Sequence, residues 1–398
     1  MDIEEVLTRG VAEVIVEAEL REKLRAGKPL RLKMGFDPSS PNLHIGHAVG
    51  LRKLRQFQEL GHTVVLIVGD WTAQVGDPSG RDQSRVMLAP EVVRANAETY
   101  MQQFFKIVDR QRTEVRWQSE WFGSFTLADV FNLTSRFTMQ QMLAHETFRK
   151  RIESEQPLSL MELLYPLLQA YDSVAIRADV EFGGTDQKFN ILAGRELMRA
   201  LGMEPQQVVL TPLLIGTDGR KMSKSFNNTI DLTMPPHEMY GRVMSMSDAQ
   251  IVPYFVNVTD VPLREIAEME QAMRAGANPR DFKMRLAREI ITQFHDAAAA
   301  QAAEDYFVRT IQQRALPDEM PEFYLAGASP IVDVLVQAGL AGSKSEARRL
   351  IAGGGVKLNG ERVDSPDLLV APDSGAVLQV GKRRFARIVG GARATHQG

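Results

Sequence analysis

The sequence predicts an α/β fold: a Rossmann-like doubly wound parallel sheet with a helical insertion, followed by a helical domain and a small α+β domain. Three observations support this prediction. Strand–helix–strand patterns span residues 30–70 and 175–215, and the segment 331–398 combines two short helices with a hairpin. Consecutive βαβ units build doubly wound sheets, whose ligands bind at the carboxyl ends of the strands.

The first strand–helix–strand unit follows from its hydrophobic pattern. Residues 30–36 (LRLKMGF) have the composition of a strand, and DPSSPN after them has turn chemistry because Pro38 and Pro41 fix φ. From Ile45 to Leu60 apolar residues recur at helical spacing, and Gly61 closes the helix. The next run, HTVVLIVGD, is apolar as expected of a parallel strand covered on both faces.

The second unit completes the predicted sheet. AIRADVEFGG and QVVLTPLLIG have the composition of strands, and a helix is predicted between them over residues 186–201. The insertion, at about 90–168, has a mostly helical pattern and contains the amphipathic, Met-rich run LTSRFTMQQMLAHETF. That run fits a packed face and also fits a subunit interface. We expect the α/β domain to span residues 1–230.

The rest of the chain divides into three parts. Residues 231–315 have a helical pattern and predict a helical domain. Residues 316–330 concentrate Pro, Gly, Ala and acidic side chains and predict a linker. In residues 331–398, Ser343 with Glu346 predicts a capping box at the start of a helix that stops at Gly353 to Gly355. The dipeptide Asn359-Gly360 then suits the type I′ turn of a hairpin.

Composition and charge narrow the class of protein. Of 398 residues, 44% are apolar and 24% charged, which excludes bulk disorder. The absence of cysteine excludes disulfides, thiolate zinc sites and cysteine nucleophiles. Apolar runs are too short for a transmembrane helix and the first residues are acidic, unlike a signal peptide, so we expect a cytoplasmic protein that does not bind membranes.

The net charge of -3 is unevenly distributed. Residues 331–398 contain ten basic and six acidic side chains, whereas residues 1–330 contain 37 and 44. A basic domain on an acidic body favours contact with a polyanion such as nucleic acid. A chance imbalance in a soluble domain is the alternative.

Two short strings point to phosphate chemistry. His44-Ile45-Gly46-His47 lies where the first predicted strand turns into its helix, and Lys221-Met222-Ser223-Lys224-Ser225 lies in a polar loop after the sheet. A helix N-terminus offers unpaired N–H groups, so two imidazoles there can face an anion, and Gly46 allows a flat ligand to approach the backbone. Two lysines can close over the same anion from the other side. Together the strings suggest a clamp for a triphosphate.

These strings resemble the HIGH and KMSKS signatures of class I aminoacyl-tRNA synthetases. GFDPSSPNLHIGH, GDPSGRDQSR, LLQAYDSVAI and GGTDQKFN are similar to the sequence blocks of bacterial tyrosyl-tRNA synthetases, and the tail resembles their S4-like RNA-binding domain. The resemblance covers essentially the whole chain. It implies activation of tyrosine with ATP to tyrosyl-adenylate plus pyrophosphate, followed by transfer of tyrosine to the 3′ end of tRNA(Tyr).

The resemblance also assigns residues to ATP. It implies that phosphate binding and catalysis depend on His44, His47, Lys221, Lys224, Arg81 and Arg85. It implies that the rest of the nucleotide contacts Gly35, Asp37, Gly46, Gly184 and Asp186, in addition to Lys224. Mg²⁺ is expected with the ATP phosphates, and no metal is expected to be bound by the protein itself. Neutralising and positioning the phosphates is then most of the catalysis.

For the amino acid, the resemblance implies that Asp77, Tyr165 and Gln169 approach the ammonium group, while Asp172 accepts from the phenolic hydroxyl. Gln187 is expected near the new acyl phosphate. Residues 165, 169 and 172 share one helix face by their spacing. The chain departs from many relatives at Lys33, where they have a tyrosine that also contacts the phenol. Discrimination of tyrosine from phenylalanine is therefore expected to rest more heavily on Asp172 and water.

Contact with tRNA is expected from the basic tail and from residues 231–315 as an anticodon-binding domain. The candidate side chains in the tail are Lys344, Arg348, Arg349, Lys357, Lys382, Arg383 and Arg384. The alternative is that these basic side chains only keep the domain soluble. The resemblance further implies a homodimer.

Three other functions are alternatives to this one. A tryptophanyl-tRNA synthetase would have a similar catalytic fold, but Asp172 and the S4-like tail favour tyrosine. A catalytically silent RNA-binding paralogue is disfavoured because both histidines and both lysines of the signatures are present. A dinucleotide oxidoreductase is disfavoured because no GxGxxG follows the first strand.

Overall fold

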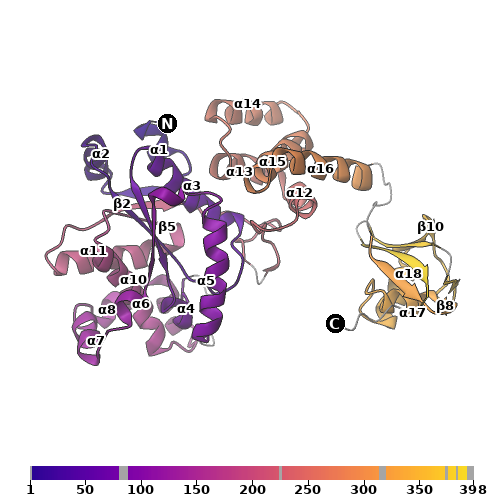
Figure 1. The fold of residues 1–398 in the computed structure, drawn as a ribbon, viewed down its shortest axis with the longest axis horizontal. Helices are drawn as coiled ribbons and strands as arrows, with labels where there is room; N and C mark the ends of the chain where they lie inside the picture. The colour runs from indigo at the N-terminus through magenta and orange to yellow at the C-terminus, as the bar shows by residue number, and fades with distance from the viewer. Residues whose placement is uncertain are drawn as a thin grey trace. The chain divides into compact units, whose positions relative to one another are not determined.

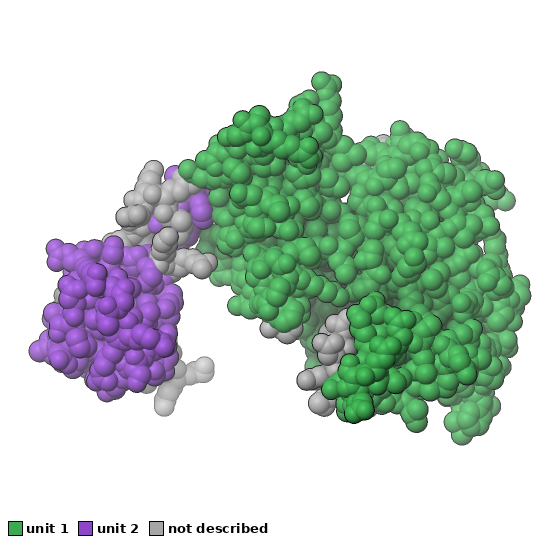
Figure 2. Space-filling view, turned by 180° about the vertical axis from the view of Figure 1, so that it is seen from behind, with its two compact units in different colours: residues 1–300 green, residues 301–398 purple. Residues whose placement is uncertain are grey.

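The computed structural model describes residues 2–79, 88–223, 226–312, 320–372, 375–381 and 384–391. The chain forms two compact units, Met1–Ala300 and Gln301–Gly398 (Figure 2). Within the described ranges, no helix has both the length and the apolar composition needed to cross a membrane.

A six-stranded sheet forms the centre of the first unit, in the order β1-β6-β5-β2-β3-β4 (Figure 1). Five strands are parallel: β2 (Arg31–Phe36), β3 (Thr63–Val68), β4 (Thr113–Trp117), β5 (Val180–Gly184) and β6 (Gln207–Thr211). The short edge strand β1 (Glu13–Ile15) pairs antiparallel with β6. The predicted doubly wound parallel sheet is confirmed.

Helices cover both faces of this sheet. Met34 on β2 faces α3 (Ile45–Glu59), since a Cβ on Gly50 of α3 would meet its side chain. Lys33, its neighbour, contacts α10 (Leu160–Ile176) instead. Because successive side chains of a strand point to opposite faces, α3 and α10 lie on opposite sides of the sheet. In Figure 1, α10 and α11 (Lys188–Ala200) flank the sheet on one side, and α3 and α5 (Pro90–Phe104) on the other.

The insertion differs from its prediction in one element. It contains β4, which extends the sheet at one edge, in a segment that the sequence predicted to be mostly helical. All five residues of β4 are only partly buried, so the sequence TEVRW lacks the apolar character of an inner strand. The strand was missed for that reason.

The Met-rich run in the insertion does not form one long helix. Helices α7 (Leu127–Thr134), α8 (Met139–Leu143) and α9 (Glu146–Glu153) divide it, because Thr138 starts a new helix through a capping box with Gln141. Leu133, Met142 and Phe148 pack in a common core, which fits the predicted packed face. Other apolar side chains of these helices remain exposed.

The segment after the sheet is helical, as predicted. It contains α12 (Pro236–Ser245), α13 (Ile251–Val258), α14 (Leu263–Arg274), α15 (Pro279–Phe294) and α16 (Ala297–Phe307). Near the amino terminus, α1 (Ile3–Thr8) and α2 (Glu17–Arg25) precede the sheet. Arg9 joins the two parts of the unit, because its guanidinium donates to the carbonyls of Val256 and Thr259 at 3.1 and 2.7 Å.

The second unit has its own sheet, in the order β10-β9-β12-β13-β7. Its strands are β7 (Glu322–Leu325), β9 (Val356–Leu358), β10 (Glu361–Arg362), β12 (Val377–Val380) and β13 (Arg384–Gly390). A separate pair joins β8 (Ser329–Pro330) to β11 (Leu369–Val370). The core lies between the larger sheet and helices α17 (Ile331–Gln337) and α18 (Lys344–Ala352).

Local signals in this unit are confirmed in part. Asn359 and Gly360 have φ of 53° and 85°, as a type I′ turn requires. Ser343 caps α18, but Glu346 accepts from Gly342 N–H at 2.8 Å instead of closing a capping box on Ser343. The segment 316–330 is not a linker throughout, because β7 pairs in parallel with β13. The paired residues of the two strands, such as Glu322 and Arg387, are 65 positions apart, beyond the reach of a local pattern.

Candidate active site

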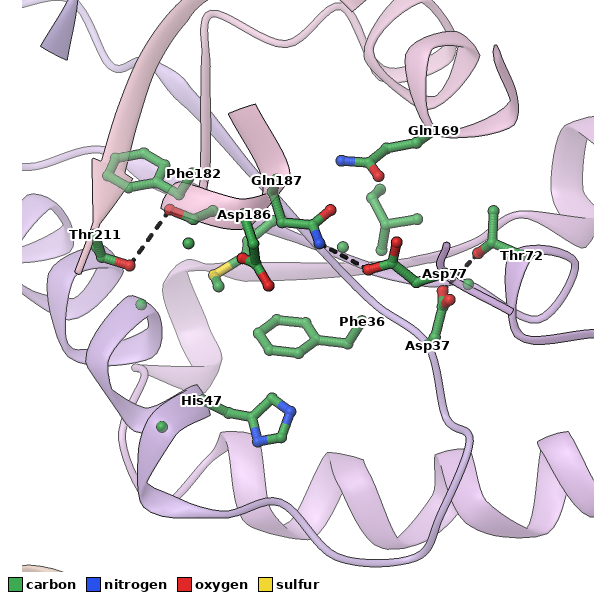
Figure 3. A pocket seen from close by; sticks show the side chains of 18 of the residues that line it. Phe36, Asp37, His47, Thr72, Asp77, Gln169, Phe182, Asp186, Gln187 and Thr211 are labelled. Carbon is green, nitrogen blue, oxygen red and sulfur yellow. Dashed lines mark hydrogen bonds between the residues drawn. The ribbon is translucent and has the colours of Figure 1, made fainter. Parts of the chain in front are cut away.

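One cavity lies at the carboxyl ends of the central strands (Figure 3). It encloses about 320 Å³, which suits a small-molecule ligand. The structure brings into its lining every described residue that the sequence analysis assigned to ATP or to the amino acid: Gly35, Asp37, His44, Gly46, His47, Asp77, Tyr165, Gln169, Asp172, Gly184, Asp186, Gln187 and Lys221. Arg81, Arg85 and Lys224 lie outside the described residues.

The first signature forms the N-terminus of α3. His44 Nδ1 accepts from Gly46 N–H at 3.2 Å, and His44 N–H donates to His47 Nδ1 at 3.1 Å. The two ring centroids are 3.9 Å apart. Because both Nδ1 atoms accept, each neutral imidazole carries its proton on Nε2, which can donate to an anion. A Cβ on Gly46 would approach His44 Nδ1 to 2.9 Å, so the turn requires glycine.

The second signature loop is braced by Asn228, a residue that sequence reasoning missed. Its side chain is buried, with 1% exposed. Asn228 Nδ2 donates to Asp218 Oδ1 at 2.7 Å and to the Lys221 carbonyl at 3.1 Å. Asn228 Oδ1 accepts from Ser223 N–H at 2.7 Å. One amide thus ties both arms of the loop together beside Lys221.

Backbone pairing connects the first signature to the segment that follows the second. Ile45 N–H donates to the Ile230 carbonyl at 2.8 Å, and Leu232 N–H donates to the Leu43 carbonyl at 2.9 Å. Met222 lies against Gly46, with its Sδ 3.6 Å from the position of a Cβ there. The histidine turn and the lysine loop, about 180 residues apart in the sequence, are therefore neighbours.

Across the mouth of the cavity, Lys221 Nζ donates to Asp186 Oδ2 at 2.8 Å. Asp186 follows β5 in a short 3-10 turn, Thr185–Gln187. A Cβ on Gly184 would lie 2.7 Å from Asp186 Oδ1, so glycine at the strand end allows this carboxylate to turn inward.

Asp172 lies at the buried end of the cavity and is 2% exposed. Gln118 Nε2 donates to its two oxygens at 2.9 and 3.1 Å, and Trp121 Nε1 donates to Oδ1 at 3.2 Å. Burial raises the pKa of Asp172 to about 7, while the charge of Lys33 and the hydrogen bond from Gln118 act in the opposite direction. These donors hold an acceptor in place for a ligand hydroxyl.

Two further hydrogen-bonded pairs lie in the lining of the cavity. Gln187 Nε2 donates to Asp77 Oδ2 at 2.7 Å, as Figure 3 shows. Tyr165 donates its hydroxyl to Asp37 Oδ2 at 2.9 Å. Burial, followed by the charge of Asp37, raises the pKa of Tyr165, so its hydroxyl remains a donor to that carboxylate. The arrangement concentrates acceptors where a ligand ammonium group could bind.

Lys33 does not line the cavity. It is fully buried beneath it, and its Nζ lies 3.0 Å from Glu181 Oε1 in an ion pair. It also donates to Ser173 Oγ at 2.7 Å and to the Gln169 carbonyl at 2.8 Å. The Lys33 side chain is therefore directed to Glu181 and not into the cavity.

Sequence reasoning missed the residues that support Asp172 and Asp37. Gln118 and Trp121 follow β4, so recognising that strand would have placed them at the ligand edge of the sheet. Thr72 Oγ1 donates to Asp37 Oδ1 at 2.6 Å. A Cβ on Gly69 would come within 2.3 Å of both Thr72 and Asp37. No local signal distinguishes this glycine.

The described candidates for tRNA contact lie on α18, β9 and β13: Lys344, Arg348, Arg349, Lys357 and Arg384. Lys344 Nζ forms an ion pair with Asp333 at 2.6 Å, and Arg348 and Arg349 are exposed. Arg384 donates to the Leu340 carbonyl at 2.9 Å, just before α18. Lys382 and Arg383 lie outside the described residues.

The matches to known proteins cover nearly the whole chain. Residues 25–312 match the family of tRNA synthetases class I (W and Y), and residues 329–374 match the S4 domain. The tyrosine–tRNA ligase of Dehalococcoides mccartyi is 54% identical over 391 residues, which cover 97% of this chain and 98% of that protein. The tyrosine–tRNA ligase of Thermotoga maritima is 50% identical over 388 residues, covering 97% of each.

A solved structure supports the fold. The C-terminally truncated mitochondrial tyrosyl-tRNA synthetase of Aspergillus nidulans superposes with a TM-score of 0.65 at 22% identity. The match covers 78% of this chain and 92% of the other.

Proposed function

Because this chain belongs to the class I tRNA synthetases for tryptophan and tyrosine, and is similar to tyrosine–tRNA ligases over nearly its whole length, we propose that the cavity at its sheet edge activates tyrosine with ATP. The resemblance to bacterial tyrosyl-tRNA synthetases is confirmed by these relatives. The function is ligation of tyrosine to tRNA(Tyr). The roles of individual residues below are part of the proposal.

The amino acid binds at the buried end. The phenolic hydroxyl donates to Asp172, whose orientation is fixed by Gln118 and Trp121. The ammonium group binds among Asp77, Tyr165 and Gln169, all of which line the same cavity. This places the carboxylate of tyrosine toward the nucleotide end.

ATP binds across the two signatures. Asp186 accepts from the ribose, Gly35, Asp37 and Gly184 line the nucleotide side, and Gln187 lies near the acyl phosphate. A carboxylate oxygen of tyrosine attacks the α-phosphorus, and the bond to the departing pyrophosphate breaks. His44 and His47 donate from Nε2 to phosphate oxygens, and Lys221 and Lys224, with Arg81 and Arg85, neutralise the pyrophosphate. The protein acts by fixing donors before charge shifts onto those oxygens.

Mg²⁺ enters with the ATP phosphates in this proposal. Magnesium usually retains several waters and is held through substrate phosphates and one or two carboxylates. Among the described residues, no group of three or more His, Cys, Asp or Glu side chains could hold a metal ion.

Transfer requires the RNA-binding parts of the chain. The ribose hydroxyl at the tRNA 3′ end attacks the carbonyl of the adenylate, and AMP leaves. Residues 231–315 serve as an anticodon-binding domain, and residues 331–398 bind tRNA phosphates through the basic side chains near α18. Arg384, anchored beside that helix, adds to this charge. The S4 match to residues 329–374 supports RNA binding.

The active form is a homodimer in the cytoplasm, where its substrates tRNA and ATP are present. Exposed apolar side chains on the insertion support a subunit interface there. They include Leu127 (67% exposed), Phe131 (63%), Met139 (54%) and Leu160 (79%). Such a group of exposed apolar residues is typical of an interface.

The observation that supports this function most strongly is that both signatures and a buried hydroxyl acceptor line one cavity. ATP–pyrophosphate exchange tests it: tyrosine should support exchange, while tryptophan and phenylalanine should give much less. Exchange with tryptophan alone would favour the other branch of the family, and absence of any adenylate would favour a silent RNA-binding protein.

A further inference from the structure

A buried ion pair lies beneath the amino-acid end of the cavity. Lys33 on β2 and Glu181 on β5 are directly paired in the parallel ladder, and their side chains are 0% and 1% exposed. Removing two charges from water is costly, and a buried pair of this kind can often be replaced by apolar residues without loss of stability. We therefore expect the pair to have a role other than stabilising the fold.

Both charged side chains form hydrogen bonds with residues of α10. Lys33 Nζ donates to the Gln169 carbonyl and to Ser173 Oγ, at 2.8 and 2.7 Å. Glu181 accepts from Ser173 Oγ at 3.0 Å and from Gln169 Nε2 at 3.2 Å, and also from Gln206. The pair thus holds the turn of α10 that presents Gln169 to the cavity.

The charge of Glu181 decides which way Gln169 faces. An ionised carboxylate accepts hydrogen bonds but cannot donate them. Gln169 must therefore turn its NH₂ group toward Glu181, which directs its oxygen to the other side. In Figure 3 the oxygen of Gln169 points toward the side of Asp77, which lines the same cavity. A ligand ammonium group has only donors, so it requires an acceptor in that place.

We propose that the Lys33–Glu181 pair is a positioning element for amino-acid recognition, which fixes the Gln169 carboxamide with its oxygen toward the ammonium group of tyrosine. This inference rests on the proposed function, because it assumes that the ammonium binds beside Gln169. It also gives Lys33 a part in binding without contact to the substrate: Lys33 pairs with the Glu181 carboxylate, and that carboxylate orients the amide.

Two tyrosine analogues separate positioning from general support. Tyramine keeps the ammonium group, whereas 3-(4-hydroxyphenyl)propionate lacks it. Their affinities are measured by calorimetry for the full chain and for the double variant Lys33→Met, Glu181→Gln, which removes both charges with little change in volume. Because residue 181 can then donate as well as accept, Gln169 can turn over. Tyramine should bind about tenfold more weakly, as expected for one charge-assisted hydrogen bond. The propionate should bind unchanged.

A second variant keeps the test informative if the double variant is less stable. A carboxylate at position 169 has two acceptor oxygens, so it presents an acceptor to the ammonium group whichever way it is turned. Gln169→Glu should therefore restore tyramine binding in the double variant, and should weaken it in the otherwise unchanged chain, where it faces Glu181. Weaker binding in both backgrounds would overturn the proposal.

The control is another buried ion pair, Arg151 with Glu162, whose Nη1 and Oε1 atoms are 2.7 Å apart. Replacing it with Met and Gln should leave the ratio of the two affinities unchanged. Equal weakening of both analogues in the Lys33–Glu181 variant, or no change in tyramine, would overturn the inference. If tyrosine-dependent exchange were normal in that case, the proposed function would still stand.

Discussion

Lys221 Nζ and Asp186 Oδ2 form an ion pair of 2.8 Å between the second signature loop and the end of β5. The proposed function gives these residues different ligands, since Asp186 accepts from the ribose and Lys221 binds departing phosphate. Binding of ATP must therefore exchange this ion pair for two contacts with the nucleotide. The pair keeps both side chains at the cavity beforehand.

Replacing Lys221 tests its phosphate role. Lys221→Ala should lower the rate of tyrosyl-adenylate formation about 100-fold, because a charge that stabilises the leaving group is lost. Tyrosine affinity should change less than about twofold, since the tyrosine site is at the other end of the cavity. Lys224→Ala should behave in the same way. Single-turnover kinetics measure both quantities.

The control for Lys221 is Lys23→Ala, which removes a surface lysine paired with Glu204. It should leave the rate unchanged. An unchanged rate in Lys221→Ala would count against the phosphate role.

Asp172 should give tyrosine activation a pH dependence. Its pKa of about 7 means that the carboxylate gains a proton as pH falls through 7 and then accepts the phenol less well. We expect kcat/KM for tyrosine to fall up to about tenfold per pH unit below 7 and to level above it. Gln118→Met removes a bond that lowers this pKa, so the fall should begin at higher pH.

Phenylalanine provides the comparison for that experiment, because it has no hydroxyl to donate. Its weak exchange should lack the dependence assigned to Asp172. A pH profile identical for both amino acids, or one that Gln118→Met does not move, would rule out this role for Asp172.

Removing the C-terminal unit should separate tyrosine activation from the transfer of tyrosine to tRNA. A chain ending at Gln312 should retain tyrosine-dependent exchange within about twofold, since the residues that line the cavity lie between 34 and 222. Charging of tRNA should fall about 100-fold or more, because phosphate contacts are lost. A cut at residue 331 would be a poorer test, since it leaves β7 without β13. Equal loss of both activities would contradict the division of labour.

The exposed apolar residues of the insertion predict that the chain forms a dimer. The intact chain should be a dimer by light scattering, and Phe131→Glu should shift it toward a monomer, because a charge would have to be buried at the interface. The exposed residue Leu263, on α14 outside the insertion, gives the control Leu263→Glu, which should remain dimeric. A monomeric wild-type chain, or a fully dimeric Phe131→Glu variant, would refute this interface.

Much of the fold could be predicted from local patterns, and the failures have physical causes. Strand β3 is apolar over its length and was predicted, whereas β4 is half-buried and was not. The signature residues share a cavity because parallel strands end at one edge. The pairing of Lys33 with Glu181 depends on strand register between distant segments, which no local pattern contains. Gln118 was missed together with its strand.

A crystal structure with tyrosine and a non-hydrolysable ATP analogue tests the central claim most directly. We expect the phenolic hydroxyl on Asp172, the ribose on Asp186, and the phosphates between the two histidines of α3 and Lys221. A nucleotide bound away from the histidines, or a tyrosine whose hydroxyl does not reach Asp172, would contradict the account.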